Sequence, residues 1–300
     1  MLNNLIKLSV NILTYKTNAN ILKKCINSID KSIPINVIEN SKFFIDKSYF
    51  KKIRKNLKIY HTGTNFGFGK GHNYGFSKTN TRYVLICNPD VIFNKDYFKN
   101  LNKLIKNDIK FHIIGSQYPK KEMFKPAYGL FDKKEINPII KSNKFGLQSV
   151  DWVVGCTMLF DLKRFKTNKI FDEKYFMFYE ETDLCKRVIS RNGIIYSGCN
   201  LLINHLGEKS SFAAIPKYRI DYVKLRNWHL MWSSFYFTKK HKGYLYSFII
   251  HLNSLIKNFL KYFIFKFFFQ TEKSAKHLYR FLGLINSMRG KKSFFRVKIK

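Results

Sequence analysis

The sequence predicts an α/β fold with a mixed, mostly parallel sheet over residues 1–215, followed by a helical, cationic and aromatic region over residues 216–300. Two observations predict this division. Short β-rich apolar runs alternate with stretches whose apolar residues recur at helical spacing, and the alternation stops near residue 216. A chain of 300 residues, 45% of them hydrophobic, is too apolar for disorder and long enough for one large domain with an appendage.

The elements follow in chain order. Residues 5–14 are short and β-rich, and residues 18–29 follow with apolar positions at helical spacing. In a sheet of this kind ligands bind outside the carboxyl ends of the strands, so polar residues at those ends are site candidates. Residues 116–150 show no clear period and are expected to be irregular. The same reasoning predicts further strands at 35–38, 57–60, 83–87, 111–115, 152–160, 194–196 and 201–203, and further helices at 47–55, 71–78, 97–105 and 180–191.

The charge of the chain restricts its partners. There are 55 Lys and Arg against 19 Asp and Glu, a net charge of +36, so the surface attracts polyanions or anionic lipid. Residues 216–300 hold 19 basic and 2 acidic side chains. Any chemistry that needs carboxylates is therefore expected in residues 1–215. Five scattered cysteines without a C-x-x-C pair predict reduced thiols in a cytosolic compartment. Lys7 and Asn11 interrupt the first apolar stretch and argue against a signal peptide.

Two loops at predicted strand ends have the composition of phosphate and metal sites. The segment NFGFGKGHNYG, residues 65–75, places glycines between a strand and a helix, where backbone N–H groups can approach an anion; a tight turn is the alternative. It is neither the dinucleotide fingerprint nor a P-loop. Asn88-Pro89-Asp90 puts a carboxylate at a strand end fixed by proline, which suits a divalent cation on a diphosphate; an ordinary turn aspartate is the alternative.

The acidic segment and one histidine complete the candidates. Glu180, Glu181 and Asp183 stand at the start of a predicted helix beside aromatic residues. Helix capping explains some of these acids, but burial beside aromatics would raise the pKa of one carboxylate and suit it to take a proton from an alcohol. His205 follows a strand and is either a half-buried histidine or a ligand.

The order of these motifs resembles glycosyltransferase family 2, and within it bacterial rhamnosyltransferase-like enzymes of surface-polysaccharide assembly. The resemblance covers roughly residues 5–240 and implies the GT-A fold, a single α/β domain with a nucleotide-binding half and an acceptor half. It rests on ILTY (12–15), ENS (39–41), NFGFGKGHNYG (65–75), NPDV (88–91), FDEKYFMFYEETDLCKR (171–187) and NH (204–205).

The resemblance also implies residue roles. Asp90 falls at the family's D-x-D position and would bind Mn²⁺ or Mg²⁺, with His205 as a second ligand. Glu181 takes the place of the usual aspartate base and is the first candidate for that role, with Asp183 the second. Glu39 stands where relatives usually carry Asp. The residues implied to bind the nucleotide sugar are Thr14, Glu39, Asn65, Gly67, Gly69, Gly71, Asn73, Asn88 and Asp90.

The implied reaction is an inverting transfer of a sugar, rhamnose being the subgroup's common case, from a nucleotide-diphosphate donor to a hydroxyl. The acceptor would be a lipid-linked surface polysaccharide of O-antigen, lipopolysaccharide or capsule type. Inversion needs one base and no covalent intermediate, and the departing diphosphate needs no acid. A loop at Glu208–Ile215 is expected to close over the site and exclude water.

The basic tail is expected to lie on a membrane surface. Tyr244–Gln270 is long enough to span a bilayer, but three central lysines, each costing about 2.5–3.5 kcal/mol, argue against a span. An interfacial helix on anionic lipid fits better; a core-packing helix is the alternative. Such a helix would bring the enzyme, peripherally bound at the inner face of the cell membrane, to a polyprenyl-linked acceptor.

Two other classes remain open on the sequence. A basic nucleic-acid-binding protein would fit the net charge, although no helix-turn-helix, zinc or RNP1-like motif accompanies it, so no specific nucleic acid is expected. A catalytically inactive nucleotide-sugar-binding assembly subunit would fit the departures at Glu39 and Glu181.

Overall fold

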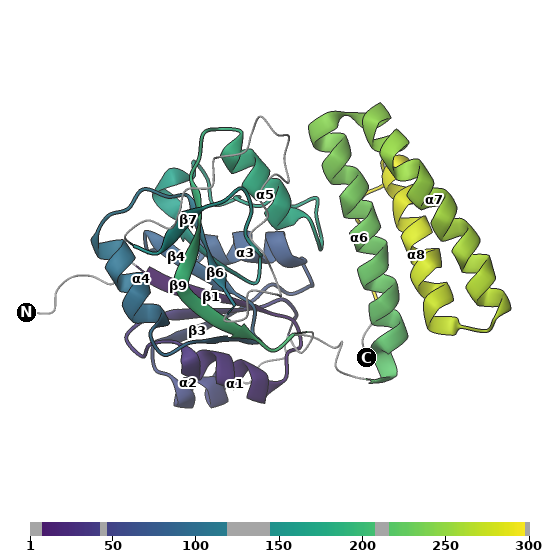
Figure 1. Cartoon of the computed structure of the whole chain (residues 1–300). Coiled ribbons are helices and arrows are strands. Elements are labelled where there is room, and N and C mark those ends of the chain that lie inside the picture. Colours follow the sequence, from purple (N-terminus) through teal and green to yellow (C-terminus); the bar gives the residue numbers. More distant parts are fainter. Residues whose placement is uncertain (1–7, 43–46, 119–144, 208–215, 298–300) are drawn as a thin grey trace, which may run out of the picture. The chain divides into compact units, whose positions relative to one another are not determined.

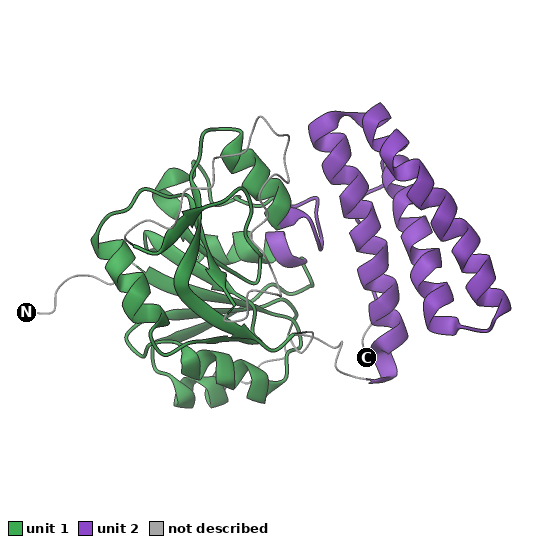
Figure 2. Ribbon diagram, in the orientation of Figure 1, with its two compact units in different colours: residues 1–66, 70–171, 181–211 green, residues 67–69, 172–180, 212–300 purple. Residues whose placement is uncertain are grey.

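The computed structural model describes residues 8–42, 47–118, 145–207 and 216–297 (Figure 1). The chain divides into two compact units, shown in Figure 2: unit 1 comprises residues 1–66, 70–171 and 181–211, and unit 2 comprises residues 67–69, 172–180 and 212–300. Two short segments of the α/β half therefore group with the C-terminal helices. The domain boundary expected between residues 215 and 216 stays a prediction.

Unit 1 is built on a nine-stranded sheet ordered β3-β2-β1-β4-β8-β6-β9-β5, with β7 beside β9. β1 to β4 pair in parallel, whereas β8 runs antiparallel to β4 and β6. The mixed α/β sheet that the sequence predicts is confirmed. The strands are β1 (Leu8–Thr14), β2 (Ile35–Glu39), β3 (Leu57–His61), β4 (Tyr83–Cys87), β5 (Val91–Phe93), β6 (Ile113–Gln117), β7 (Leu147–Ser149), β8 (Thr157–Asp161) and β9 (Ile195–His205).

Helices cover both faces of this sheet. α1 (Ala19–Ser28), α2 (Lys47–Ile53) and α4 (Tyr97–Lys106) share one hydrophobic core with Ile12 of β1. α3 (Phe68–Ser77) packs against Leu13, the next residue of β1 after Ile12. A Cβ on Gly71 of α3 would lie 2.6 Å from Leu13 Cδ1. Since successive strand residues face opposite sides, α3 packs on the other face, and its glycine permits the close approach.

Several elements differ from the sequence prediction. The stretch of residues 116–150 was expected to be irregular, but it contains the strand β7, which pairs with β9. β9 is one strand rather than two, because its polar middle is held by the neighbouring strands β6 and β7. β5 was not predicted; its pairing with β9 sets Val91 opposite His205. β8 begins at Thr157 rather than at residue 152. The expected closing loop, Glu208–Ile215, lies outside the described residues.

The C-terminal helices of unit 2 are α6 (Arg219–Lys242), α7 (Tyr244–Phe267) and α8 (Thr271–Met288), and α8 packs against both others. A Cβ on Gly283 of α8 would lie 2.3 Å from the carbonyl oxygen of Trp228, so these backbones touch. Ser287 of α8 donates to the carbonyl of Trp232 at 2.9 Å. No helix in the described ranges is long and apolar enough to cross a bilayer.

Two buried histidines predict that the protein loses stability in acid. Burial lowers the pKa of His72 in unit 1 and of His229 in unit 2 from 6.5 to about 3. Between those pH values the unfolded chain binds more protons than the folded one, so stability falls as pH decreases from 6.5 toward 3, by up to about 1.4 kcal/mol per pH unit for each histidine. The urea midpoint should therefore be lower at pH 5 than at pH 7.

The variant that tests this prediction removes one of the two buried imidazoles. His229→Gln should flatten the loss of unfolding free energy between pH 7 and 5 relative to the wild type. Equal slopes for the wild type and His229→Gln would contradict the assignment.

Candidate active site

The carboxyl ends of β1 and β2 are joined by Glu39. The register sets Thr14 opposite Glu39, whose side chain is fully buried. The hydroxyls of Thr14 and Ser41 donate to its two carboxylate oxygens at 2.5 Å each, and the backbone N–H of Lys16 donates at 3.2 Å. The structure thus uses the Glu39 carboxylate to hold two loops at the site edge in place.

Asn40 fixes the loop after β3. Its amide nitrogen donates to Asn65 Oδ1 at 3.0 Å, and its amide oxygen accepts from the backbone N–H of Phe66 at 2.9 Å. Asn65 also hydrogen-bonds Tyr15, whose pKa is raised by burial. From the sequence, Asn65 was placed in the site, whereas Asn40 and Tyr15 were included only as members of the ENS and ILTY motifs, without a role for either.

Asp90 and His205 are brought together by the short β5–β9 ladder. Asp90 precedes β5, His205 ends β9, and Asp90 Oδ1 lies 3.1 Å from His205 Nε2. The Asp90 side chain is fully buried, and its Oδ2 has no hydrogen-bond donor among the described residues. Burying a carboxylate oxygen without a hydrogen-bond donor costs free energy unless a cation or another positive group binds it. The environment of Asp90 Oδ2 is therefore the one expected of a metal ligand.

The residues present fit a divalent cation with two protein ligands. Carboxylate oxygen and imidazole nitrogen are ligands that Mn²⁺ accepts, and an octahedral ion would leave further positions to phosphate oxygens and water. Within the described ranges no group of three or more His, Cys, Asp and Glu side chains is placed to hold a metal. The remaining ligands would therefore come from the substrate. Asn88 lies at the same turn, its N–H donating to the carbonyl of Cys156 at 2.9 Å.

The acidic segment forms the first turn of α5 (Glu180–Ile189), and its acids differ in environment. Asp183 is fully buried and accepts from Arg187 Nε at 2.7 Å. Arg187 also donates to the carbonyl of Ile170 at 2.8 Å. Glu181 is half-buried; burial raises its pKa, although N–H groups of its own residue and of Thr182 lower it. The two acids therefore differ: burial raises the pKa of Glu181, whereas Asp183 is held in an ion pair.

The Cys156 thiol is buried and interacts electrostatically with carboxylates of both segments. Burial, with a smaller contribution from the charges of Asp90 and Glu181, raises the pKa of this thiol to about 11. Both carboxylates therefore lie within electrostatic range of one sulfur atom. The candidate metal ligand and the candidate base therefore both interact with the same buried thiol of unit 1.

Two aromatic residues that sequence reasoning missed border these groups. Tyr118, directly after β6, lies 3.1 Å from Cys156 through its hydroxyl, and its ring centroid is 6.3 Å from that of His205. Trp152 donates from its indole N–H to the hydroxyl of Thr182 at 3.1 Å, which ties the segment before β8 to the first turn of α5. Tyr118 could be found from its place at a strand end, whereas Trp152 had no comparable signal.

Asn73 links α3 to the start of the acidic segment. Its amide nitrogen donates to the carbonyl of Phe171, and its amide oxygen accepts from the N–H of Phe171, both at 2.9 Å. The side chain is buried. The Asn73 amide thus pairs with both backbone groups of Phe171 and holds this residue against α3.

In unit 2 the glycine loop rests on the loop of residues 172–180. The N–H of Phe68 donates to the carbonyl of Phe176 at 2.9 Å. A Cβ on Gly67 would lie 2.2 Å from that same oxygen, and Gly67 has φ +79°. Gly67 thus permits both the left-handed backbone and the close approach, and Gly69 follows it, buried, in the first turn of α3.

Helix α6 holds the same 172–180 loop. Ser233 donates to the carbonyl of Met177 at 2.9 Å, and Lys240 contacts Asp172 Oδ2 at 2.7 Å. Phe178 and Tyr179 have φ of 69° and 66°, a conformation costing about 1–2 kcal/mol per residue outside glycine. Strain of this kind is typical of functional segments, and this loop leads directly into Glu180 and Glu181.

Gly67→Ala is expected to disturb the glycine loop far more than a control with the same backbone conformation. Gly63 also has φ +79°, but a Cβ there meets no atom within 4 Å. Gly63→Ala should cost about 1–2 kcal/mol of unfolding free energy from the left-handed backbone alone. Gly67→Ala should cost more than that, measured by urea unfolding, because its Cβ would also meet the Phe176 carbonyl. Equal effects of the two substitutions would contradict the role of the Phe176 contact.

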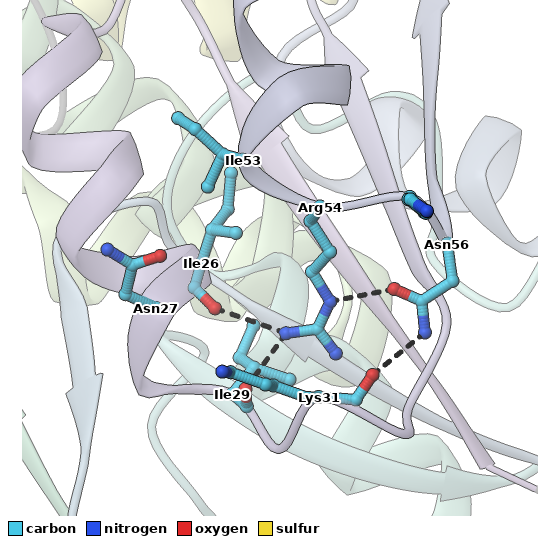
Figure 3. A pocket seen from close by; sticks show the side chains of 8 residues that line it. Ile26, Asn27, Ile29, Lys31, Ile53, Arg54 and Asn56 are labelled. Carbon is cyan, nitrogen blue, oxygen red and sulfur yellow. Dashed lines mark hydrogen bonds between the residues drawn. The ribbon is translucent and has the colours of Figure 1, made fainter.

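The hollow in Figure 3 is separate from this site. Its Arg54 donates to the backbone carbonyls of Ile26 at 3.3 Å and Ile29 at 2.8 Å and to Asn56 Oδ1 at 2.8 Å. Asn56 precedes β3, so this hollow lies at the amino ends of the parallel strands. Arg54 caps α1, and its donors are used for that purpose.

Comparison with known proteins gives the family. The sequence model described as glycosyl transferase family 2 matches residues 9–163, which include Thr14, Glu39 and Asp90 but precede Glu181 and His205. The chain is 26% identical over 197 residues to the low-salt glycan biosynthesis hexosyltransferase Agl10 of Haloferax volcanii. That match covers 62% of this chain and 62% of the relative.

Solved structures show the same fold. The mannosyltransferase PcManGT of Pyrobaculum calidifontis, in complex with GDP-Man and Mn²⁺, is similar over 95% of this chain and 88% of its own, with TM-score 0.56 and 10% identity. S. aureus TarS 1-349 is similar over 95% of this chain and 92% of its own, with TM-score 0.50 and 14% identity. The fold is thus α/β GT-A with C-terminal helices, and the chain belongs to glycosyl transferase family 2.

Proposed function

We propose that this protein is a hexosyltransferase that moves a sugar from a nucleotide-diphosphate donor to an acceptor hydroxyl with inversion, dependent on Mn²⁺ or Mg²⁺. The observation that carries the proposal is the pairing of a buried carboxylate oxygen on Asp90 with His205, with Glu181 interacting electrostatically with the same Cys156 thiol as Asp90. Family membership supports the donor class.

Asp90 and His205 would hold the cation. A divalent ion bound there supplies charge stabilisation for the departing diphosphate. Asp90 is well suited to this because its buried oxygen needs a positive partner, and the β5–β9 ladder sets its direction. Asn88 lies at the same turn and would contact the donor ribose or the phosphates.

Glu181 would act as the base. Its raised pKa, caused by burial, keeps the carboxylate basic enough to accept a proton from a hydroxyl. The deprotonated oxygen attacks the anomeric carbon opposite the leaving diphosphate, the bond from that carbon to the phosphate oxygen breaks, and the configuration inverts. Asp183, already paired with Arg187, would orient α5 and is the second candidate base.

The donor would be bound at the strand ends. Glu39 would affect donor binding indirectly, by positioning Thr14 and Ser41, because its carboxylate oxygens accept hydrogen bonds from their hydroxyls. Asn65, Gly67 and Gly69 would contact the nucleotide directly, and Asn73 would hold α3 in place. Rhamnose is the sugar that the sequence resemblance favours. The relative from Haloferax volcanii, a hexosyltransferase of glycan biosynthesis, supports the wider hexose class.

The acceptor would be a polyprenyl-linked saccharide of an O-antigen or capsule type polymer, met at the inner face of the cell membrane. The highly basic helical region supports this location, because residues 216–300 carry a net charge of +17.

The test is donor turnover. The purified protein, given a panel of nucleotide sugars with Mn²⁺, should release nucleoside diphosphate from one of them, slowly to water and faster with lipid-linked acceptor. Release should stop with a chelator and in Asp90→Asn. Tight donor binding without any release under any condition would instead identify an inactive binding subunit and overturn the proposal.

A further inference from the structure

Helix α7 has an inverted distribution of polarity. Its buried residues are all polar: Ser247, His251 and Asn258. Each is hydrogen-bonded inside the bundle: the Ser247 hydroxyl donates to the carbonyl of Phe235 at 3.0 Å, and His251 Nε2 lies 3.0 Å from the hydroxyl of Ser234. Asn258 Oδ1 lies 2.9 Å from His277 Nδ1. The bundle therefore takes up the polar side of this helix.

The outer side of α7 is an apolar stripe. Its residues recur at spacings of three and four and so share one helical face. Their exposed fractions run from 38% for Leu252 to 77% for Phe267. At 1.5 Å per residue the stripe is about 33 Å long. Its members are Leu245, Ile249, Leu252, Ile256, Leu260, Phe263 and Phe267.

Cations and aromatic rings border this stripe. By the turn of about 100° per residue, Lys257 lies on one side of it and Lys266 on the other, whereas Lys261 lies farther round the helix, toward its buried side; all three are exposed. At its end Phe268 and Phe269 are 63% and 92% exposed. A continuous apolar row on a monomer surface marks an interaction site, and a basic border selects anionic partners.

We propose that the α7 stripe docks the protein on an anionic lipid bilayer, lying along the interface with its apolar side chains among the acyl chains. The flanking lysines meet lipid phosphates, and Phe267 to Phe269 insert at the end of the helix. A second copy of the chain fits less well, because stripe-to-stripe packing would bring together two copies of a region with 19 basic and 2 acidic side chains over residues 216–300.

The first test is sedimentation of the full chain with vesicles of phosphatidylcholine containing one quarter phosphatidylglycerol, without donor or acceptor. Wild type should bind these vesicles and be released by high salt. Ile256→Asp should weaken binding at least about 10-fold, because it removes an apolar side chain that the bilayer would bury and puts a negative charge in its place. Ile220→Asp is the matched control: Ile220 is 40% exposed on α6, against 50% for Ile256, and the charge change is the same.

The second test separates local from net charge. Lys257, Lys261 and Lys266 replaced together by glutamine should weaken binding about 5-fold per lysine. The same change at Lys99, Lys103 and Lys106, exposed on α4, should have a much smaller effect. Equal losses in the two triple variants would overturn the docking face.

Two further outcomes would overturn the proposal. One is a wild type that ignores anionic vesicles at low salt. The other is a lipid-free dimer, seen by sedimentation velocity, that Ile256→Asp converts to monomer while vesicle binding is unchanged. Because the assay contains no nucleotide sugar, failure here leaves the transfer reaction standing, and failure of donor turnover leaves the docking face standing.

Discussion

Asp90→Asn is expected to lower metal-dependent kcat/KM for glycosyl transfer by about 10³-fold. The substitution keeps the shape of the side chain and its contact with His205 but removes the charge that would bind the cation. It should also raise the melting temperature of the metal-free protein, because the wild type buries a carboxylate oxygen that has no donor among the described residues. A gain of 1 kcal/mol would appear as about 2–4 °C.

The matched control is Asp96→Asn, at an exposed residue before α4 whose side chain makes no cap hydrogen bond. Activity and melting temperature should both stay at wild-type values. Asp90→Asn with normal metal dependence, or with a lower melting temperature in the absence of metal, would remove Asp90 from the metal site.

Glu181→Gln is expected to lower kcat by about 10²–10⁴-fold, because it removes the group that accepts the proton. Affinity for the nucleotide sugar should stay unchanged, because Glu181 is not proposed to contact it. Burial raises the pKa of Glu181, so the wild-type rate should rise with pH through that raised value as the carboxylate loses its proton, and then level off. The variant should lack this rise. Glu272→Gln, the same change in a solvent-exposed ion pair on α8, should behave as wild type.

Asp183→Asn distinguishes the two candidate bases. Asp183 is buried but its partner Arg187 is 25% exposed, so loss of this charged hydrogen bond should destabilise the protein by about 1–3 kcal/mol. The remaining activity should keep the wild-type pH dependence. Loss of the pH-dependent rise in Asp183→Asn, and its retention in Glu181→Gln, would assign the base to Asp183.

The sequence predicted the parallel half of the fold well, because β1, β2 and β4 are short, buried runs in which apolar residues predominate, and hydrophobic patterning detects such runs. The sequence divided β9 at residues 197–200, because pairing of Ser197 with β6 and β7 and of Gly198 with β7, which carries the strand into this stretch, cannot be seen in sequence. β5 has only three residues, too few to show a period.

The candidate site was predicted where residues directly follow strands. Asp90 and His205 were named from their positions, but their contact depends on the β5–β9 register and could not be derived. The internal role of Glu39 was also hidden, because it depends on three donors from different segments. The inverted polarity of α7 was missed for the same reason: which side of a helix is buried depends on its neighbours.

The central claim is that a cation bound by Asp90 holds the paired phosphates of a sugar nucleotide. The most direct measurement is the melting temperature with a panel of nucleoside diphosphates, with and without Mn²⁺. One nucleotide should stabilise the wild type strongly only when Mn²⁺ is present, and Asp90→Asn should lose that metal-dependent part. Equal stabilisation with and without Mn²⁺, or none by any nucleoside diphosphate, would contradict the account.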